Sequence, residues 1–222
     1  MSGWRWWLTA GLVVALAGCG GMVGVYRGPE PFGGKEYAVS PPKVTLSREV
    51  RVVVLMLADE RPAMEHDLDW VRQSHSFSDN LGQPAEVRTE FDRAIKSGLS
   101  ASRRIRLVAP ETFLQTRDAD LIISGRILRC EAERKMGWLT ADFHGRAEIE
   151  IVLRSGEGKS ITESPLEFES EVEIPWKPPA SDARVDEIPV GYAASAVEKA
   201  IRQVAESFLT SSELADALLA LN

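Results

Sequence analysis

The sequence has few of the residues that metal centres and disulfide scaffolds require. It contains 2 cysteines and 3 histidines in 222 residues, which excludes a disulfide-dense scaffold and a four-cysteine zinc site. It has no excess of positive charge either, since 26 Lys and Arg stand against 33 Asp and Glu, for a formal net charge of −7. Binding along a nucleic-acid backbone needs clustered cations, so no nucleic-acid partner is expected. The remaining composition, 44% hydrophobic and 27% charged, is typical of a globular protein.

The first residues combine a short positive start with an apolar stretch. Arg5 precedes the run 8–16, whose length is typical of a signal-peptide core. The run ends in Leu-Ala-Gly-Cys at residues 16–19, which closely resembles the bacterial lipobox. In lipoproteins with this pattern, cleavage falls between Gly18 and Cys19, and the Cys19 sulfur accepts a diacylglyceryl group. The resemblance therefore predicts a signal peptide over residues 1–18 and lipidation, including palmitate-type acylation, at Cys19.

The alternative for this segment is an uncleaved membrane helix. Residues 6–26 carry no charge and are about long enough to span a bilayer. Their five glycines make a poor helix, which favours cleavage instead. Two or three acyl chains would then hold the protein firmly at a membrane. Gly20, rather than Asp, follows Cys19, and by the bacterial sorting rule this predicts the outer membrane, with the domain facing the periplasm, or the cell membrane if the source is not Gram-negative.

The segment after the lipidation site is rich in glycine and proline and has no helical or strand period. We interpret residues 19–48 as the lipidated cysteine and a flexible tether, although Tyr37 could dock part of it onto the domain. Residues 49–222 are expected to form one globular domain, because their length suits a single core. Cys130 then has no internal partner for a disulfide, and we expect it to be a small buried apolar residue.

The first part of the domain has the pattern of a β-α-β unit. The β-branched run 51–58 predicts a central strand buried on both faces. A polar loop is expected over 63–83, followed by a helix that Pro84 opens. The apolar face of that helix recurs at every fourth residue, at Val87, Phe91, Ile95 and Leu99. A second strand is expected at 104–109.

Three further strands are expected at 119–133, with a possible bulge at Gly125, at 138–154 and at 166–174. Alternating residues in the last two predict one buried and one wet face. A long helix is expected from about Gly191, followed by a short helix capped by Ser211/Ser212. The predicted fold class is therefore α+β: a single mixed sheet, β-α-β then an antiparallel meander, with two long helices packed on one face.

Several of these features together resemble one family of envelope proteins. The lipobox, a strand ending in Asp-x-Arg-Pro (Asp59, Arg61, Pro62), a long loop, a helix, a meander and the Ala-rich helix of residues 193–205 resemble the YajG-like lipoproteins. The family implies an outer-membrane lipoprotein. The same order of elements is also similar to auxiliary lipoproteins of ABC-type transporters, which are non-enzymatic. Neither resemblance implies catalytic residues.

Candidate contact residues fall in three places. Asp59 and Arg61 lie at a predicted strand end, where they either pair with each other and with the turn or contact a ligand. Trp70 lies in the expected loop, where it either caps the core or belongs to an interaction patch. An acidic row projects from one face of the last strand, as a solvated face paired with Arg146 or Arg154 or as a contact for a cation-rich partner: Glu167, Glu169, Glu171 and Glu173.

The sequence offers no motif for catalysis or for a metal ion. His66 and His75 are in the expected loop and His144 is far away in a strand, so their spacing does not suggest a metal site. No Gly-x-Ser-x-Gly elbow is present, which speaks against a hydrolase. We therefore expect no enzyme activity and no cofactor. The expected function is protein interaction or assembly in the cell envelope, and the alternative is lipid or small-molecule binding as a transporter accessory. Oligomeric state does not follow from the sequence.

Overall fold

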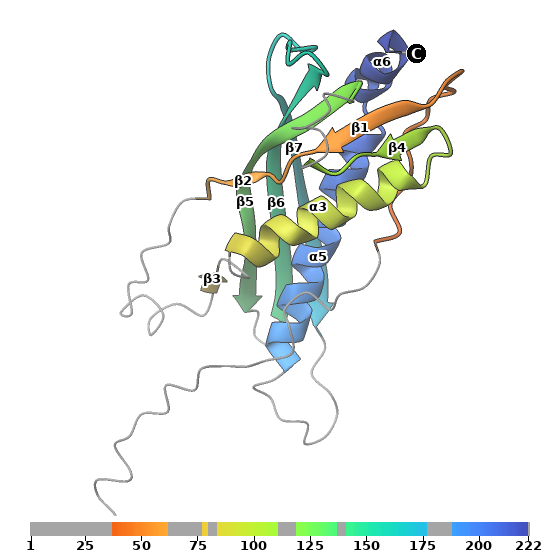
Figure 1. Ribbon diagram of the computed structural model, residues 1–222. Coiled ribbons are helices and arrows are strands. Elements are labelled where there is room, and N and C mark those ends of the chain that lie inside the picture. Colours follow the sequence, from red (N-terminus) through yellow and green to blue (C-terminus); the bar gives the residue numbers. More distant parts are fainter. Residues whose placement is uncertain are drawn as a thin grey trace, which may run out of the picture. The chain divides into compact units, whose positions relative to one another are not determined.

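The computed structural model describes residues 37–61, 77–79, 84–110, 119–136, 141–176 and 188–221 (Figure 1). The predictions for Gly18, Cys19, Trp70, His66 and His75 lie outside these residues. Among the described helices, none combines the length and the apolar character needed to cross a membrane.

The described strands form one mixed sheet of seven strands. The main path runs β4-β1-β5-β6-β7, and the short strands β2 and β3 both pair with β5 beside this path. Their bounds are β1 Val50–Val54, β2 Ala58–Asp59, β3 Phe77–Asp79, β4 Ile105–Leu107, β5 Leu121–Met136, β6 Ala141–Ser155 and β7 Leu166–Trp176. Helix α3, Pro84–Ser100, connects the first part of the sheet to β4.

Strand β1 lies between β4 and β5 and runs parallel to both. Val52 and Val54 join the main core, whereas Val53 points to a small second core with Ala119 and Ile122 on the other face of the sheet. Because both faces of β1 are covered, its sequence is a continuous apolar run rather than an alternating one. The predicted β-α-β unit and its central strand are confirmed.

Strands β5, β6 and β7 form the expected antiparallel meander. The bulge predicted at Gly125 is wrong. The register instead shifts between Ile127 and Arg129, so that Leu128 is the extra residue. Gly125 has a different role, because a side chain there would place its Cβ 1.9 Å from the carbonyl oxygen of Glu150 on the neighbouring strand.

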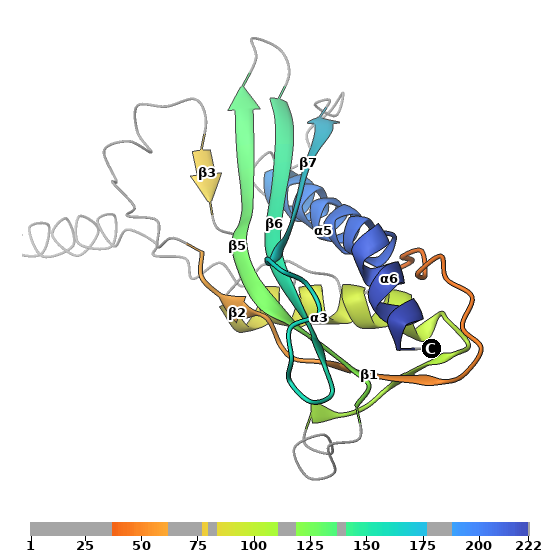
Figure 2. The same ribbon diagram turned by 90° about the horizontal axis from the view of Figure 1, so that it is seen from above.

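The two long helices lie on one face of the sheet, as the fold class α+β predicted (Figure 2). Helix α5, Ile188–Leu209, packs against β6 and β7, and α3 packs against α5. Helix α6, Ser212–Ala220, begins after Ser211, whose side chain accepts a hydrogen bond from the backbone N–H of Leu214 and so caps the helix as expected. The largest fully buried side chains of the common core are Phe91, Phe143, Phe208, Leu57, Ile95, Leu99, Leu121, Ile123, Ile127, Ile149, Ile151 and Leu153.

Residues 37–48, which the sequence assigned to the tether, belong to the folded domain. Tyr37, Val39 and Leu46 are buried in the main core. The Ser97 hydroxyl of α3 donates a hydrogen bond of 2.6 Å to the carbonyl oxygen of Tyr37. Ser40 donates to Glu206 of α5, and Arg48 donates to the carbonyl oxygen of Leu221. The expected start of the domain at residue 49 is therefore corrected, because these scattered apolar residues dock without forming a helix or a strand of their own.

Candidate functional site

The face of β5, β6 and β7 that points away from the helices carries a dense set of charged side chains. Inward residues of β6 such as Ile149 and Ile151 fill the core, so the intervening residues project from the opposite face. Because Leu128 is an extra residue in β5, Arg126 and Arg129 project from the same face although they are three positions apart. We call this face the outer sheet face; its residues are Arg126, Arg129, Glu131 and Glu133 of β5, His144, Arg146, Glu148 and Glu150 of β6, and Glu167, Glu169, Glu171 and Glu173 of β7.

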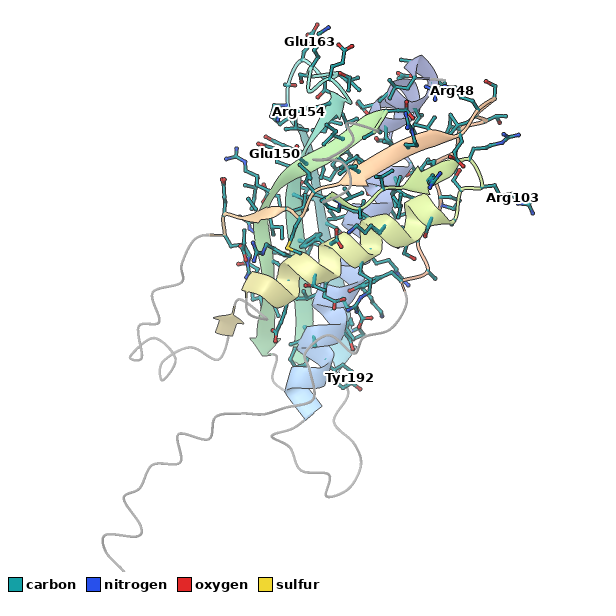
Figure 3. All side chains as sticks on the ribbon, in the orientation of Figure 1. Arg48, Arg103, Glu150, Arg154, Glu163 and Tyr192 are labelled. Atoms are coloured by element: carbon teal, nitrogen blue, oxygen red, sulfur yellow. The ribbon has the colours of Figure 1, made fainter. Side chains whose placement is uncertain are left out.

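One end of the outer sheet face is organised by Arg126. Its Nε and Nη2 donate to the two carboxylate oxygens of Glu150 at 2.9 and 2.8 Å, a bidentate pair. Glu150 is labelled in Figure 3. Its Nη1 donates to Glu60, after β2, at 2.7 Å. These hydrogen bonds raise the pKa of Arg126 above its usual value, with Glu150 as the larger cause. The negative charge of Glu150 is thus balanced by Arg126 of β5.

At the other end, Arg146 lies close to three glutamates, and His144 contacts one of them. Its guanidinium lies 3.7 Å from Glu131, 3.4 Å from Glu133 and 3.2 Å from Glu171. His144 Nδ1 also lies 3.1 Å from Glu171 Oε1. The hydrogen bond from Arg146 is the main reason why the pKa of Glu171 is lowered, and the same bond raises the pKa of Arg146. The predicted pairing of the acidic row with Arg146 is confirmed for Glu171.

Glu167 and Glu169 lie in a different environment from Glu171. In the register of the sheet, Glu167 is opposite Glu150 and Glu169 is opposite Glu148, so like charges face each other across β6 and β7. Within the described residues, neither carboxylate has a hydrogen bond or ion pair. The pairing expected with Arg154 is absent there, because Arg154 is opposite Ile122 of β5, beyond the end of β7.

A small hollow of about 280 Å³ opens on the same face. Its charged lining comes from two arginines and three glutamates: Arg129, Arg146, Glu148, Glu169 and Glu171. Among the twelve residues named above for the outer sheet face, eight glutamates stand against three arginines and one histidine. The face is therefore acidic towards β7 and balanced in charge towards β5. The carboxylates available to a cationic group lie on the β7 side.

Asp59 and Arg61 form a buried ion pair instead of an open site. Arg61 Nε and Nη2 each donate to a different carboxylate oxygen of Asp59 at 2.9 Å, and the Arg61 backbone N–H donates to Oδ1 at 3.2 Å. Only 6% of the Arg61 side chain and 10% of the Asp59 side chain are exposed. Arg61 Nη1 also donates to the carbonyl oxygen of Cys130, at 3.3 Å. Both groups thus use their hydrogen-bonding capacity on each other and on β5, which is the structural one of the two predicted roles.

The pKa of Asp59 shows which effect dominates there. Burial alone would raise it, but the hydrogen bonds from the Arg61 side chain and backbone outweigh burial, so that the pKa of Asp59 is lowered. Arg88 of α3 contributes to the lowering, and its own Nε is buried without a hydrogen-bond partner among the described residues.

The Cys130 thiol is fully buried on the inner side of β5. Burial raises its pKa to about 12, so the thiol stays protonated at neutral pH. Cys130 is therefore a small apolar core residue, as predicted.

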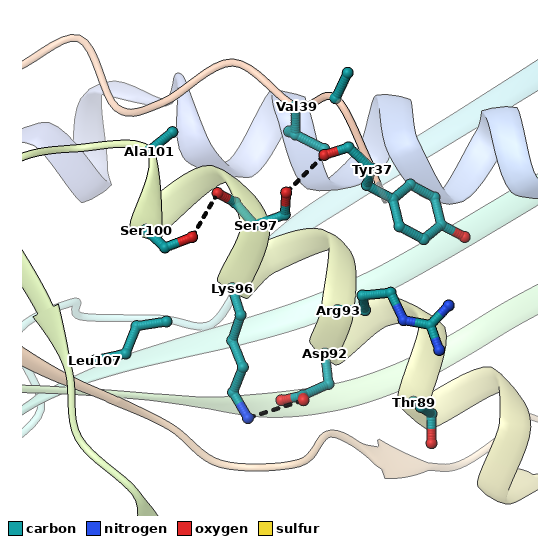
Figure 4. A pocket seen from close by; sticks show the side chains of 11 residues that line it. Tyr37, Val39, Thr89, Asp92, Arg93, Lys96, Ser97, Ser100, Ala101 and Leu107 are labelled. Carbon is teal, nitrogen blue, oxygen red and sulfur yellow. Dashed lines mark hydrogen bonds and ion pairs between the residues drawn. The ribbon is translucent and has the colours of Figure 1, made fainter. Parts of the chain in front are cut away.

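A larger hollow lies between α3 and the chain at residues 37–39 (Figure 4). It has a volume of about 760 Å³ and is open to solvent on one side. Lys96 pairs with Asp92 at 2.8 Å across its floor, and Arg93 pairs with the buried Glu90 at 2.9 Å. The rest of the lining is mostly hydroxyl-bearing or small, so the hollow is polar on the helix side and apolar near Leu107.

The Tyr37 ring borders this hollow, and its hydroxyl is buried near Glu90. Burial, and then the negative charge of Glu90, raise the pKa of Tyr37 well above its usual value. The phenol remains neutral at all physiological pH values. Tyr37 therefore serves as a buried structural anchor that holds residues 37–39 against the domain.

The sequence did not single out the charged residues of β5, although Arg126, Arg129, Glu131 and Glu133 all take part in ion pairs on the outer sheet face. Arg126, Arg129, Glu131 and Glu133 do alternate with apolar residues, which is a usable signal. The extra residue Leu128 interrupts this alternation between Arg126 and Arg129, so the charged row is hard to recognise from the sequence. Within the described residues, no group of three or more His, Cys, Asp and Glu could hold a metal ion; His144 lies on the outer sheet face.

The comparisons with known proteins give distant structural likenesses. No family model and no curated protein matches the chain. A hypothetical protein, CT253, from Chlamydia trachomatis is 14% identical, with 72% of this chain and 98% of that chain covered and a TM-score of 0.39. A minor lipoprotein from Acinetobacter baumannii is 13% identical, with 72% and 87% covered and a TM-score of 0.40. Lipoprotein GNA1162 from Neisseria meningitidis is 11% identical, with 69% and 99% covered and a TM-score of 0.26. At these values nothing about the activity of this chain follows from the likenesses, and the resemblance to YajG-like lipoproteins stays a prediction.

Proposed function

We propose that the chain is a lipid-anchored bacterial envelope protein, without enzyme activity, that acts through protein contacts made by its folded domain. The observation that carries the proposal is the outer sheet face, where Glu167 and Glu169 of β7 have no ion pair among the described residues and lie opposite other glutamates. The Leu-Ala-Gly-Cys pattern at residues 16–19 supports the anchor. In this proposal the domain is held at the periplasmic side of the outer membrane.

Charge placement is the reason to prefer a protein partner. Glu169 and Glu167 lie directly opposite Glu148 and Glu150, whose own ion pairs are with Arg129 at 3.9 Å and Arg126 at 2.8 Å, so the two β7 carboxylates have only like charge across from them. A cation-bearing partner would relieve this repulsion when it binds. Complementary charge speeds the encounter and selects the partner more than it adds affinity, which suits an assembly role.

The test is a map of photo-crosslinks in cells from the full-length chain. A photoreactive residue is placed at Glu131 on the outer sheet face, at Ser100 beside the hollow of α3, and at Arg103 in the turn after α3. A protein partner predicts discrete adducts from at least one of these positions, and their loss when Cys19→Ser removes the anchor. Adducts no stronger than those of an unrelated periplasmic protein, from every position, would contradict the proposal.

A second function is favoured by the hollow of about 760 Å³ between α3 and residues 37–39. Its lining combines apolar surface with Lys96, Arg93 and several hydroxyl groups, which suits a small molecule with both polar and apolar parts. This corresponds to an accessory that binds a small molecule for an envelope transporter. Native mass spectrometry of the purified chain tests it: a co-purifying mass that disappears in Ser97→Trp supports binding, and the bare chain mass alone argues against it.

A further inference from the structure

Strand β7 ends the sheet with one paired side and one side to which no described residue pairs. Among the described strands, β7 pairs with β6 alone. It is 11 residues long, whereas β4 at the opposite edge has only 3. A long edge strand is a ready template for another strand, so natural proteins either cover such an edge or use it.

The alternation of backbone groups shows which residues of β7 present their N–H and C=O groups at this edge. The Leu153 carbonyl and the Ser155 N–H of β6 both bond towards residues 159–161, on the β7 side. The backbone N–H and C=O groups of the odd-numbered residues of β6 therefore point towards β7. Their register partners in β7 are the even-numbered residues, whose backbone groups point back towards β6. The odd-numbered residues of β7 must point their backbone groups away from β6, towards the open edge.

Pro175 fits this assignment. Proline has no N–H, so within a sheet it is tolerated where the missing donor would have faced solvent. Pro175 is odd-numbered and lies in register with Asp142 without interrupting the β6–β7 ladder, which continues to Trp176. The four odd-numbered residues before it are the glutamates of the acidic row.

The two side-chain rows of β7 have different chemistry. Glu167, Glu169, Glu171 and Glu173 are exposed on the outer sheet face. On the helix side, the partly buried residues Leu166, Phe168, Val172 and Ile174 pack against the core, with the Phe168 ring 5.6 Å from that of Phe208. An added strand would cover this apolar row on one face and meet four carboxylates on the other.

From this arrangement we infer that the edge of β7 receives an extended segment of another protein in which basic and apolar residues alternate. The inference rests on the proposed function and names the kind of partner for it. The partner's backbone pairs with the free N–H and C=O groups of the odd-numbered residues. Its lysines or arginines lie opposite the glutamates, and its apolar side chains extend the row of Phe168 and Val172.

The same charges act against pairing between two copies of this chain. Two β7 strands joined antiparallel about a two-fold axis keep the same face outward, so glutamates would lie opposite glutamates. Like charges on the edge thus disfavour self-association while they favour a basic partner. The experiment therefore has to distinguish a basic partner from a second copy of this chain at the edge of β7.

The experiment uses the full-length lipidated chain in detergent and synthetic peptides of about nine residues, a length suited to one strand. One peptide alternates lysine with valine, and the control has the same composition with its lysines grouped at one end. Fluorescence anisotropy should show binding of the alternating peptide roughly tenfold tighter than the control, because only the alternating one places every lysine opposite a glutamate.

Amide hydrogen exchange by NMR distinguishes strand addition from simple charge attraction. In the free chain, the amides of Phe168 and Val172 should exchange slowly, since they pair with β6, and those of Glu169 and Glu171 should exchange fast. On binding of the alternating peptide, the Glu169 and Glu171 amides should become protected. Binding without this protection would overturn the inference.

Charge reversal supplies the matched comparison. The double variant Glu167→Lys with Glu169→Lys should weaken binding of the alternating peptide by about tenfold or more, while Glu163→Lys in the preceding exposed turn should leave it unchanged. Equal losses in both variants would overturn the inference, as would a full-length chain that self-associates through β7 and loses that association on charge reversal. If the alternating peptide fails to bind while the cellular crosslinks persist from Glu131, Ser100 or Arg103, the inference is wrong and the proposed function still stands.

Discussion

Gly145 of β6 lies directly against the backbone of Ala196 in α5. A Cβ atom at Gly145 would sit 2.2 Å from the Ala196 carbonyl carbon and 2.3 Å from its oxygen. Real Cβ atoms do not approach backbone atoms so closely, so the absence of a side chain at Gly145 is what lets α5 rest on the sheet at this point. The position of the whole helix over β6 and β7 therefore depends on one glycine.

Gly145→Ala should destabilise the domain strongly. The clash is with backbone, which moves only if α5 shifts, and overpacking of this kind costs about 1–3 kcal/mol or more. Urea unfolding followed by circular dichroism measures the loss. Gly158→Asn is the control, because Gly158 has φ of 83° but nothing within 4 Å of its Cβ position, and asparagine tolerates that conformation. Equal stability of Gly145→Ala and the parent chain would show that α5 is not seated as described.

The buried pair of Asp59 and Arg61 should show strong coupling. Asp59→Ala leaves the Arg61 guanidinium buried without its carboxylate, for which about 3–5 kcal/mol of stability should be lost. Asp59→Ala combined with Arg61→Met removes both charges and should lose less than the single change. Unfolding free energies of the two single variants and the double variant complete the cycle. Additive losses would mean that the two groups act independently, as a ligand-contact role would allow.

Glu157 and Lys159 give the comparison for that cycle. They form an ion pair of 2.8 Å in the turn after β6, with both side chains well exposed. Solvent screens such a pair, so Glu157→Ala should change stability little. A large loss there would mean that the measurement reports something other than the burial of the ion pair.

Low pH should destabilise the fold through Asp59 and Asp120. Burial raises the pKa of Asp120, but hydrogen bonds from the Arg51 backbone and the Arg51 and Arg48 side chains outweigh it, and the net pKa is lowered, as for Asp59. In the unfolded chain an aspartate has a pKa of about 3.9 and takes up a proton first as pH falls. The stabilisation is therefore complete above about pH 5, where both states are ionised, and is lost as pH falls through the lowered native pKa.

The measurement is the free energy of unfolding in urea at pH 7, 5 and 3. Asp120→Asn should lower stability at pH 7 and flatten its fall between pH 5 and 3, because the variant has no carboxylate to protonate. The same change at Glu163 on the exposed turn, Glu163→Gln, should leave the slope as in the parent chain. A parallel fall in Asp120→Asn and the parent would contradict the assignment.

The parts of the fold that follow a local period were predictable from the sequence. The alternation of Ala147, Ile149, Ile151 and Leu153 gave the inner face of β6, and the spacing of Val87, Phe91, Ile95 and Leu99 gave the buried face of α3. Ser211 followed by a short apolar stretch was sufficient for the cap of α6. In each of these, the physical cause lies within a few residues along the chain.

The features that depend on distant contacts were not predictable. Gly125 and Gly145 look alike in the sequence, yet neither marks the bulge, and each is required by a backbone that approaches from another element. Residues 37–48 contain proline and no period, so they resemble a tether, although Tyr37 and Leu46 complete the core. The charged rows of the outer sheet face needed the register of three strands before their matched and unmatched members could be told apart.

Cys130 should be unreactive in the folded chain. Its side chain is 0% exposed and its pKa is about 12, so neither access nor ionisation favours attack on a thiol reagent. In a Cys19→Ser chain, a maleimide should label Cys130 only after denaturation. Cys130→Ser should lose about 1–3 kcal/mol of stability, because a hydroxyl would be buried there without a new partner, and Cys130→Ala should lose less. Rapid labelling of the native chain would mean that β5 opens locally.

Truncation tests whether residues 37–48 belong to the domain. A chain of residues 37–222 keeps Tyr37, Val39 and Leu46, whereas a chain of 49–222 exposes the surfaces of α3 and α5 that they cover. Complete burial of one such side chain contributes about 1.5–3 kcal/mol, partly offset by the entropy of ordering the segment, so the shorter chain should lose on the order of 3 kcal/mol. Urea unfolding compares the two chains. A shorter chain as stable as the longer one would restore residues 37–48 to the tether, whereas the loss expected here means that residues 37–48 belong to the domain and that the tether is shorter than composition suggests.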